Sequence, residues 1–275
     1  MYAENIKLSS WTKAGLFRHT YSTIIFVTVC FSYAFEYKSM FDTLFAREKF
    51  KDSIEVASIG CGNMIDYWGL VEALGEIGSG ECYIKYRGID TIDWNYKIEA
   101  REKDEVKFTK VNAATIFQKT STLISNVYIF PKSISEFSNE EFQDICESFR
   151  KKEIQRDRIH ILISLRSDQG SIDRDMERSE KIISAIKQNG FITEDNATTF
   201  IHYKDEDRGI KKIDYKFEYP NEAIELLTSL NTECSTYVSN RENCTSDCKN
   251  LNRWPVLKAR NIRYQVLTFD RKDSL

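Results

Sequence analysis

Short apolar runs alternate along the chain with longer stretches of helical periodicity. The clearest runs cover residues 55–59, 83–89, 106–111, 126–130 and 158–165, and most stop at a glycine, a proline or a polar residue. Runs of this length between turn residues predict strands. The run at 158–165 is nearly continuously apolar, which is typical of a parallel strand buried on both faces.

Helical signals fill the intervals between these strands. One helix is expected at 64–77, where glycines 78 and 80 end it, and another at 173–188 before Gly190. A third begins at Ser138, because a serine followed three residues later by Glu141 forms a capping box. Alternating strands and helices predict an α/β fold with a parallel sheet covered on both faces.

The two ends of the chain depart from this alternation. Residues 1–50 are predicted to form an N-terminal helical extension, because Phe26, Tyr33, Tyr37, Phe41 and Leu44 recur on one helical face. Residues 51–275 then form the α/β domain. Further strands are expected near 198–203 and 262–269, with residues 204–261 as an insertion before the last strand.

Charge gives little direction as to partners. The chain has 39 basic and 42 acidic residues, a formal net charge of -3, so the whole molecule does not attract nucleic acid strongly. From Arg241 to Leu275, however, eight basic and four acidic residues give a local charge of about +4. This stretch is either an ordinary solvated surface or a patch that binds RNA.

Cysteine usage and hydropathy favour a cytoplasmic protein with no membrane span. The seven cysteines are odd in number and four of them, Cys30, Cys61, Cys82 and Cys146, are scattered, as expected of reduced thiols. The apolar run at 21–35 is shorter than the roughly 20 residues that cross a bilayer. Cys234, Cys244 and Cys248 lie close together in a polar stretch, where they are either unliganded thiols or zinc ligands.

The most informative segment is the end of the first predicted strand. There Gly60 and Gly62 frame a tight turn, and a helix starts within a few residues. Glycine in such a turn leaves room for a ligand lying across it, and we expect the turn amides to face that ligand. Asp90 ends the next strand, where a carboxylate is placed to accept both hydroxyls of a ribose.

These segments resemble the class I S-adenosylmethionine-dependent methyltransferases over residues 54–190. The run Ser58-Ile59-Gly60-Cys61-Gly62, with Asp66 beyond it, resembles their first motif, and Gly88-Ile89-Asp90 resembles their second. The resemblance implies a doubly wound, Rossmann-like sheet of seven strands, mostly parallel, with the last strand antiparallel. It also implies S-adenosylmethionine as cofactor and methyl transfer by direct in-line displacement. The cofactor-binding residues that it implies are Ser58, Gly60, Cys61, Gly62, Asp66, Asp90, Asn112, Ala113 and Phe130.

The acceptor is not readable from the chain, and RNA, protein and small molecules all stay open. The fourth strand runs into Phe130-Pro131-Lys132-Ser133, which lacks the Asn/Asp-Pro-Pro-aromatic sequence of enzymes that methylate base amino groups. No cysteine lies there for cytosine-C5 chemistry. Lys132 is a candidate for orienting an acceptor or is a solvated loop lysine, and Tyr33 and Tyr37 either pack in the core or cover the cofactor.

Two other functions remain open. One is a catalytically silent Rossmann-like module that serves as a binding or structural subunit, an alternative that Asn112 favours because an acidic residue is common there. The other is an NAD-dependent oxidoreductase. Ile65 disfavours it, because the dinucleotide fingerprint requires a small residue at that position.

Overall fold

The computed structural model describes residues 20–94, 99–166, 169–204 and 261–272. Residues 36–204 and 261–275 form one compact unit, and residues 1–35 and 205–260 are assigned to a second. Cys234, Cys244 and Cys248, expected as either unliganded thiols or zinc ligands, lie outside the described residues, as does most of the basic stretch. The architecture below is that of the first unit.

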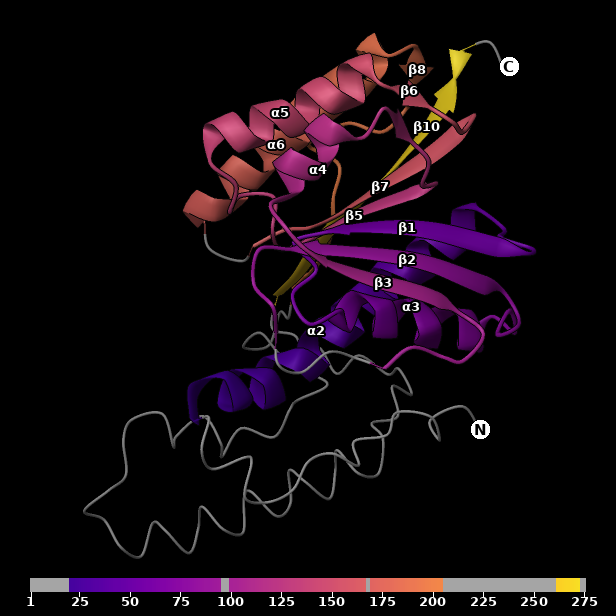
Figure 1. The fold of residues 1–275 in the computed structure, drawn as a ribbon, viewed down its shortest axis with the longest axis vertical. Coiled ribbons are helices and arrows are strands. Elements are labelled where there is room, and N and C mark those ends of the chain that lie inside the picture. Colours follow the sequence, from indigo (N-terminus) through magenta and orange to yellow (C-terminus); the bar gives the residue numbers. More distant parts are fainter. Residues whose placement is uncertain (1–19, 95–98, 167–168, 205–260, 273–275) are drawn as a thin grey trace, which may run out of the picture. The chain divides into compact units, whose positions relative to one another are not determined.

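The unit is built on one large sheet (Figure 1). In order of pairing, its strands are β3 (Glu105–Lys110), β2 (Tyr83–Asp90), β1 (Ser53–Ile59), β5 (Val127–Pro131), β7 (Arg158–Ser164), β10 (Asn261–Arg271) and β8 (Phe191–Ile192). An eighth strand, β9 (Ile201–Lys204), also pairs with β10. The seven predicted strands are therefore confirmed, the one near 198–203 as β9, and the two-residue strand β8 is an addition that the sequence did not predict.

Strand directions follow the expected pattern. Strands β1, β2, β3, β5 and β7 pair in parallel, whereas β10 runs antiparallel to β7 and to β8. Along the chain, β1, β2 and β3 step toward one edge, and β5 and β7 step toward the other. The direction of winding therefore reverses between β1 and β5, and the crevice at such a reversal is where open α/β sheets bind ligands.

Helices cover both faces of the sheet. Figure 1 shows α4 (Ala113–Lys119), α5 (Asn139–Lys151) and α6 (Gln169–Gln188) on one face and α3 (Ile65–Glu76) on the other. A separate pair of two-residue strands, β4 (Thr122–Leu123) and β6 (Glu153–Ile154), lies outside the sheet. The doubly wound architecture predicted from the sequence is confirmed.

Helix α2 (Thr20–Arg47) brings its second half to the sheet. Tyr37, Phe41 and Leu44 are buried, as the predicted apolar face requires. The hydroxyl groups of Thr43 and Tyr264 are 2.9 Å apart, and Arg47 donates to the Val266 carbonyl at 2.7 Å, so α2 is fixed to β10. None of the helices in the described ranges is both long and apolar enough to cross a bilayer.

Candidate functional site

The turn after β1 uses its two glycines for different reasons. Both have a left-handed backbone, with φ of 74° at Gly60 and 56° at Gly62. A Cβ on Gly60 would lie 2.5 Å from the Cβ of Ser133, whereas a Cβ on Gly62 would meet no atom within 4 Å. The sequence predicts that a ligand excludes side chains at both positions. At Gly60 it is Ser133 that excludes a side chain, and of the two glycines only Gly62 borders open space.

The backbone amides of the turn are bonded within the protein. Gly60 and Cys61 both donate to the Ile89 carbonyl, at 2.8 and 3.1 Å, and Gly62 donates to Oδ2 of Asp90 at 2.8 Å. The expectation that these amides face a ligand is therefore wrong for this structure. Their hydrogen bonds instead fasten the turn to the carboxyl end of β2.

Asp90 is placed as predicted, at the end of β2 and against the glycine turn. Its second oxygen, Oδ1, accepts the Ile92 amide at 2.8 Å, and the residue is partly exposed. Each carboxylate oxygen can accept more than one hydrogen bond, so Asp90 keeps the capacity to accept hydroxyl groups. Positions 60, 62 and 90, which are remote along the chain, thus meet at the carboxyl edge of the sheet.

A buried polar pair lies beneath the turn. Asp66, in the first turn of α3, is fully buried and accepts hydrogen bonds from the Tyr86 hydroxyl at 2.9 and 3.0 Å. Burial raises the pKa of Asp66 to about 6, although the hydrogen bonds from the Tyr86 hydroxyl oppose the shift. Ser58 is also fully buried. In the structure these two predicted cofactor residues support the turn from inside the protein.

Cys61 also points inward. Its side chain is 4% exposed, and a Cβ built on Gly88 would lie 2.8 Å from its sulfur. Burial raises the pKa of the Cys61 thiol above its usual range, so the sulfur is a neutral packing group at neutral pH. Gly88 is therefore required by Cys61, because a larger residue in β2 would displace the turn.

The last three predicted cofactor-binding residues, Asn112, Ala113 and Phe130, take structural positions. Asn112 is the N-cap of α4: its side chain accepts the Ala114 amide at 2.9 Å and also donates to Glu141. Ala113 is 3% exposed and Phe130 is fully buried in β5. Asn112 is partly exposed, so of these three it alone reaches the surface appreciably.

Lys132 is not a solvated loop lysine. Its Nζ is 2.9 Å from Oε1 of Glu36 and 3.0 Å from the Leu165 carbonyl, and its side chain is 17% exposed. Its backbone is left-handed, with φ of 55°. Lys132 therefore sits at the carboxyl edge as predicted, but tied to the protein by a carboxylate from α2.

Sequence reasoning missed three residues of this edge and, for a fourth, its contact with Gly60. Tyr86 shares the inner face of β2 with Gly88, and the period-two alternation of that strand could have indicated it. Glu36 is a charge within an apolar helical run, which is a signal for a buried partner. Ile92 is 54% exposed directly beyond Asp90. Ser133 behind Gly60 has no local sequence signal.

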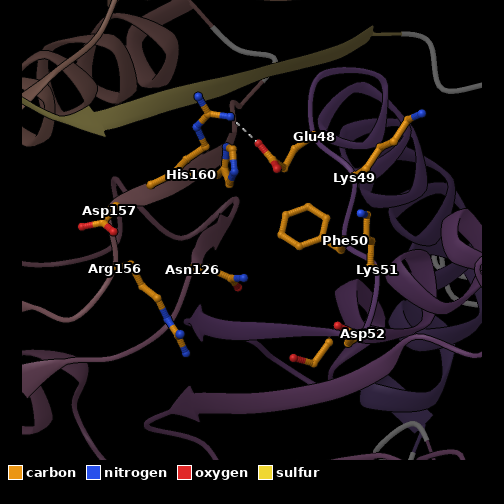
Figure 2. A pocket seen from close by; sticks show the side chains of 11 residues that line it. Glu48, Lys49, Phe50, Lys51, Asp52, Asn126, Arg156, Asp157 and His160 are labelled. Atoms are coloured by element: carbon orange, nitrogen blue, oxygen red, sulfur yellow. Dashed lines mark hydrogen bonds and ion pairs between the residues drawn. The ribbon is translucent and has the colours of Figure 1, made fainter. Parts of the chain in front are cut away.

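A pocket of about 400 Å³ lies at the opposite, amino-terminal edge of the parallel strands (Figure 2). Figure 2 shows Phe50, Asn126 and His160 around its centre. Arg158 is paired with Glu48 at 2.7 Å, so this cation is already neutralised. The pocket borders the starts of the strands, whereas the glycine turn and Asp90 lie at their ends, so it is separate from the candidate cofactor site.

No protein-family model and no curated protein matches the chain. Among solved structures, the plantazolicin methyltransferase BpumL in complex with SAH is similar at 12% identity, with a TM-score of 0.41, over 91% of this chain and 88% of that one. A SAM-dependent methyltransferase from Archaeoglobus fulgidus is similar at 12% identity and a TM-score of 0.40, over 85% and 94%. Mycolic acid cyclopropane synthase CmaA1 is similar at 8% identity and a TM-score of 0.40, over 85% of this chain and 88% of that one.

Proposed function

We propose that the chain is an S-adenosylmethionine-dependent methyltransferase whose cofactor binds over the turn at Gly62, beside Asp90. One observation carries the proposal. At the point where the sheet reverses its winding, the side-chain-free surface of Gly62 lies against a partly exposed carboxylate, with Gly62 N and Asp90 Oδ2 only 2.8 Å apart. A ribose fits this arrangement, because its two hydroxyls need one acceptor and its ring needs open backbone.

The hydrogen bonding of the turn favours a cofactor without phosphate groups. A dinucleotide needs turn amides that are free to bind its pyrophosphate. Here the amides of residues 60, 61 and 62 are all bonded to Ile89 or Asp90. S-adenosylmethionine has no phosphate and does not need these donors. Together with the bulky Ile65 at the start of α3, this weighs against the NAD-dependent alternative.

When bound, S-adenosylmethionine supplies a methyl group on a good leaving group. The chain's contribution is then to hold the two reactants in line and to keep water out. Asp90 would hold the ribose, Gly62 would border the cofactor, and the exposed side chain of Ile92 offers an apolar surface beside Asp90 for a planar ring. Lys132 and Ser133, at the end of β5, border the acceptor side of this arrangement.

Calorimetry with S-adenosylhomocysteine tests the proposal directly. We expect saturable binding to the full chain and at least a tenfold loss of affinity in Asp90→Ala. Ser138→Ala is the matched control, because it also removes a side chain that accepts a backbone amide, but at the N-terminus of α5. Absence of binding at millimolar ligand, or unchanged affinity in Asp90→Ala, would refute this cofactor site.

A catalytically silent module is the second candidate, and Asn112 is the observation that favours it. That side chain caps α4 and donates to Glu141, so both of its polar atoms already have partners within the protein. The two functions differ in outcome: a silent module that has lost its cofactor site binds no S-adenosylhomocysteine. For an active enzyme, RNA is the first acceptor to test because of the basic stretch from Arg241. Transfer of labelled methyl groups to total RNA, protein and small-molecule fractions would identify the class.

A further inference from the structure

A buried carboxylate from α2 reaches the carboxyl edge of the sheet. Glu36 is 3% exposed. Its Oε1 accepts hydrogen bonds from the Lys132 ammonium, at 2.9 Å, and from the Ser164 hydroxyl at the end of β7. A buried carboxylate is unfavourable unless it is paired and hydrogen-bonded, and both conditions are met here. Glu36 thus joins α2 to the ends of β5 and β7.

The lysine that it holds has an unusual backbone. Among the described residues, Lys132 and Met64 alone have a positive φ without being glycine. L-residues with a Cβ disfavour this conformation, and it persists where neighbouring contacts enforce it, often at functional sites. At Lys132 the enforcing contacts run through the side chain, to Glu36 and to the Leu165 carbonyl.

Ser133, the residue after Lys132, connects the left-handed backbone of Lys132 to the glycine turn. The Ser133 hydroxyl donates to the carbonyl of Ile59, the last residue of β1, and its Cβ lies where a side chain on Gly60 would be. The Ser133 carbonyl in turn accepts the Glu136 amide at 2.9 Å. The backbone direction at Lys132 therefore sets where Ser133 meets the turn.

We propose that Glu36 is a positioning residue of the cofactor site, which holds Lys132 in its left-handed conformation and thereby keeps Ser133 against Gly60. That this placement sets the affinity for S-adenosylmethionine rests on the proposed function. The claim that Glu36 fixes the segment after β5 does not rest on the proposed function. The two parts are tested by separate measurements.

The experiment compares four forms of the full chain: the wild type, Glu36→Gln, Glu36→Gln/Lys132→Gly and Asp42→Asn. Asp42 is the matched control, because it lies on the same helix and is paired with the buried Lys38 at 2.8 Å. Hydrogen exchange at the Glu136 amide reports the segment after β5, and calorimetry with S-adenosylhomocysteine reports the site. Thermal unfolding measures the stability of each form.

Glu36→Gln is expected to speed exchange at Glu136 about tenfold and to weaken S-adenosylhomocysteine binding by a similar factor. Adding Lys132→Gly should bring both values back to within about threefold of the wild type, because glycine adopts a positive φ without help from a partner. Asp42→Asn should lower the melting temperature and change neither value. A purely structural role for Glu36 would give no rescue by glycine.

Normal exchange and normal affinity in Glu36→Gln would overturn the proposal, as would a double variant no better than the single one. If the wild type binds no S-adenosylhomocysteine, the proposed function fails, and the exchange rates alone still decide whether Glu36 positions Ser133. An equal effect of Asp42→Asn would assign the change to a general loosening of α2 and would also overturn the proposal.

Discussion

Ser133 occupies the space that a side chain on Gly60 would need, since a Cβ there would lie 2.5 Å from the Ser133 Cβ. Gly60 is thus required for packing inside the protein. Gly62, two residues later, borders open space, which the cofactor fills under the proposed function. A motif that reads as a single unit in the sequence therefore has two functions that can be separated.

Gly60→Ala and Gly62→Ala should separate these functions. Gly60→Ala adds both overpacking and an unfavourable φ, and we expect it to lower the free energy of unfolding by about 3 kcal/mol. Gly62→Ala carries only the φ cost of about 1 kcal/mol, but should weaken S-adenosylhomocysteine binding at least tenfold. Denaturant unfolding and calorimetry measure the two effects. Equal destabilisation by both substitutions would contradict the assignment.

Ile92→Ser should weaken cofactor binding without harming the fold. The side chain is 54% exposed, and surface substitutions of this kind usually change stability by less than about 0.5 kcal/mol. Loss of an apolar surface beside Asp90 should reduce S-adenosylhomocysteine affinity about threefold to tenfold. The control is Ile77→Ser, which removes an isoleucine that is 50% exposed at the end of α3. Affinity loss in the control alone would count against Ile92.

Gly88 and Cys61 should be energetically coupled. A Cβ on Gly88 would lie 2.8 Å from the Cys61 sulfur and 3.0 Å from the Tyr86 ring, so Gly88→Ala should be destabilising by about 2 kcal/mol. Cys61→Ala removes the sulfur, and the double variant should recover about 1 kcal/mol relative to additivity. A double-mutant cycle of unfolding free energies measures this term. If the unfolding free-energy changes of the two substitutions simply add, the turn moves away from the new side chain freely and the two residues are not coupled.

Asp66 should make the protein less stable as the pH rises. Its folded pKa is raised by burial to about 6 from an ordinary 3.8. Between these values the folded carboxyl keeps a proton that the unfolded one has lost, so stability declines from about pH 4 to pH 6. Above that window the buried carboxylate costs about 3 kcal/mol. Asp66→Asn removes this contribution, so the difference in unfolding free energy between the variant and the wild type should change by about 2 kcal/mol between pH 4.5 and pH 7.

His160 should act in the opposite direction. Burial, and then the charge of Arg158, lowers its folded pKa to about 4 from 6.5. As the pH falls through this interval the unfolded imidazole takes up a proton and the folded one does not, so about 3 kcal/mol of stability is lost. His160→Asn should abolish that loss. Because the two slopes oppose each other, each single variant should depend on pH more steeply than the wild type between pH 4 and pH 6.

Much of the fold was predictable because its signals are local. The apolar runs bounded by turn residues fixed β1, β2, β3, β5 and β7 to within two residues at either end. The capping box is confirmed in both directions: Ser138 Oγ accepts the Glu141 amide at 3.1 Å, and the Glu141 carboxylate accepts the Ser138 amide at 2.7 Å. Both kinds of signal depend on residues at most a few positions apart.

What could not be predicted depends on remote contacts or on very short elements. Strand β8 has two residues and α4 has seven, too few to show a period. Lys132 meets Glu36 across 96 positions, and nothing near either residue specifies the pair. The sequence could likewise place Gly60 in a tight turn, but not identify Ser133 as the residue that fills the space beside it.

Strand β10 has a consequence for synthesis on the ribosome. It enters the sheet between β7 and β8, pairing with seven residues of β7, yet it follows them in the chain by about a hundred residues. Until residues 261–271 emerge, β7 presents one bare, strongly apolar edge, and β8 has no neighbour on its β10 side. A nascent chain at that stage exposes a template for aggregation, so shielding by a chaperone would matter most in the interval before the last strand is translated.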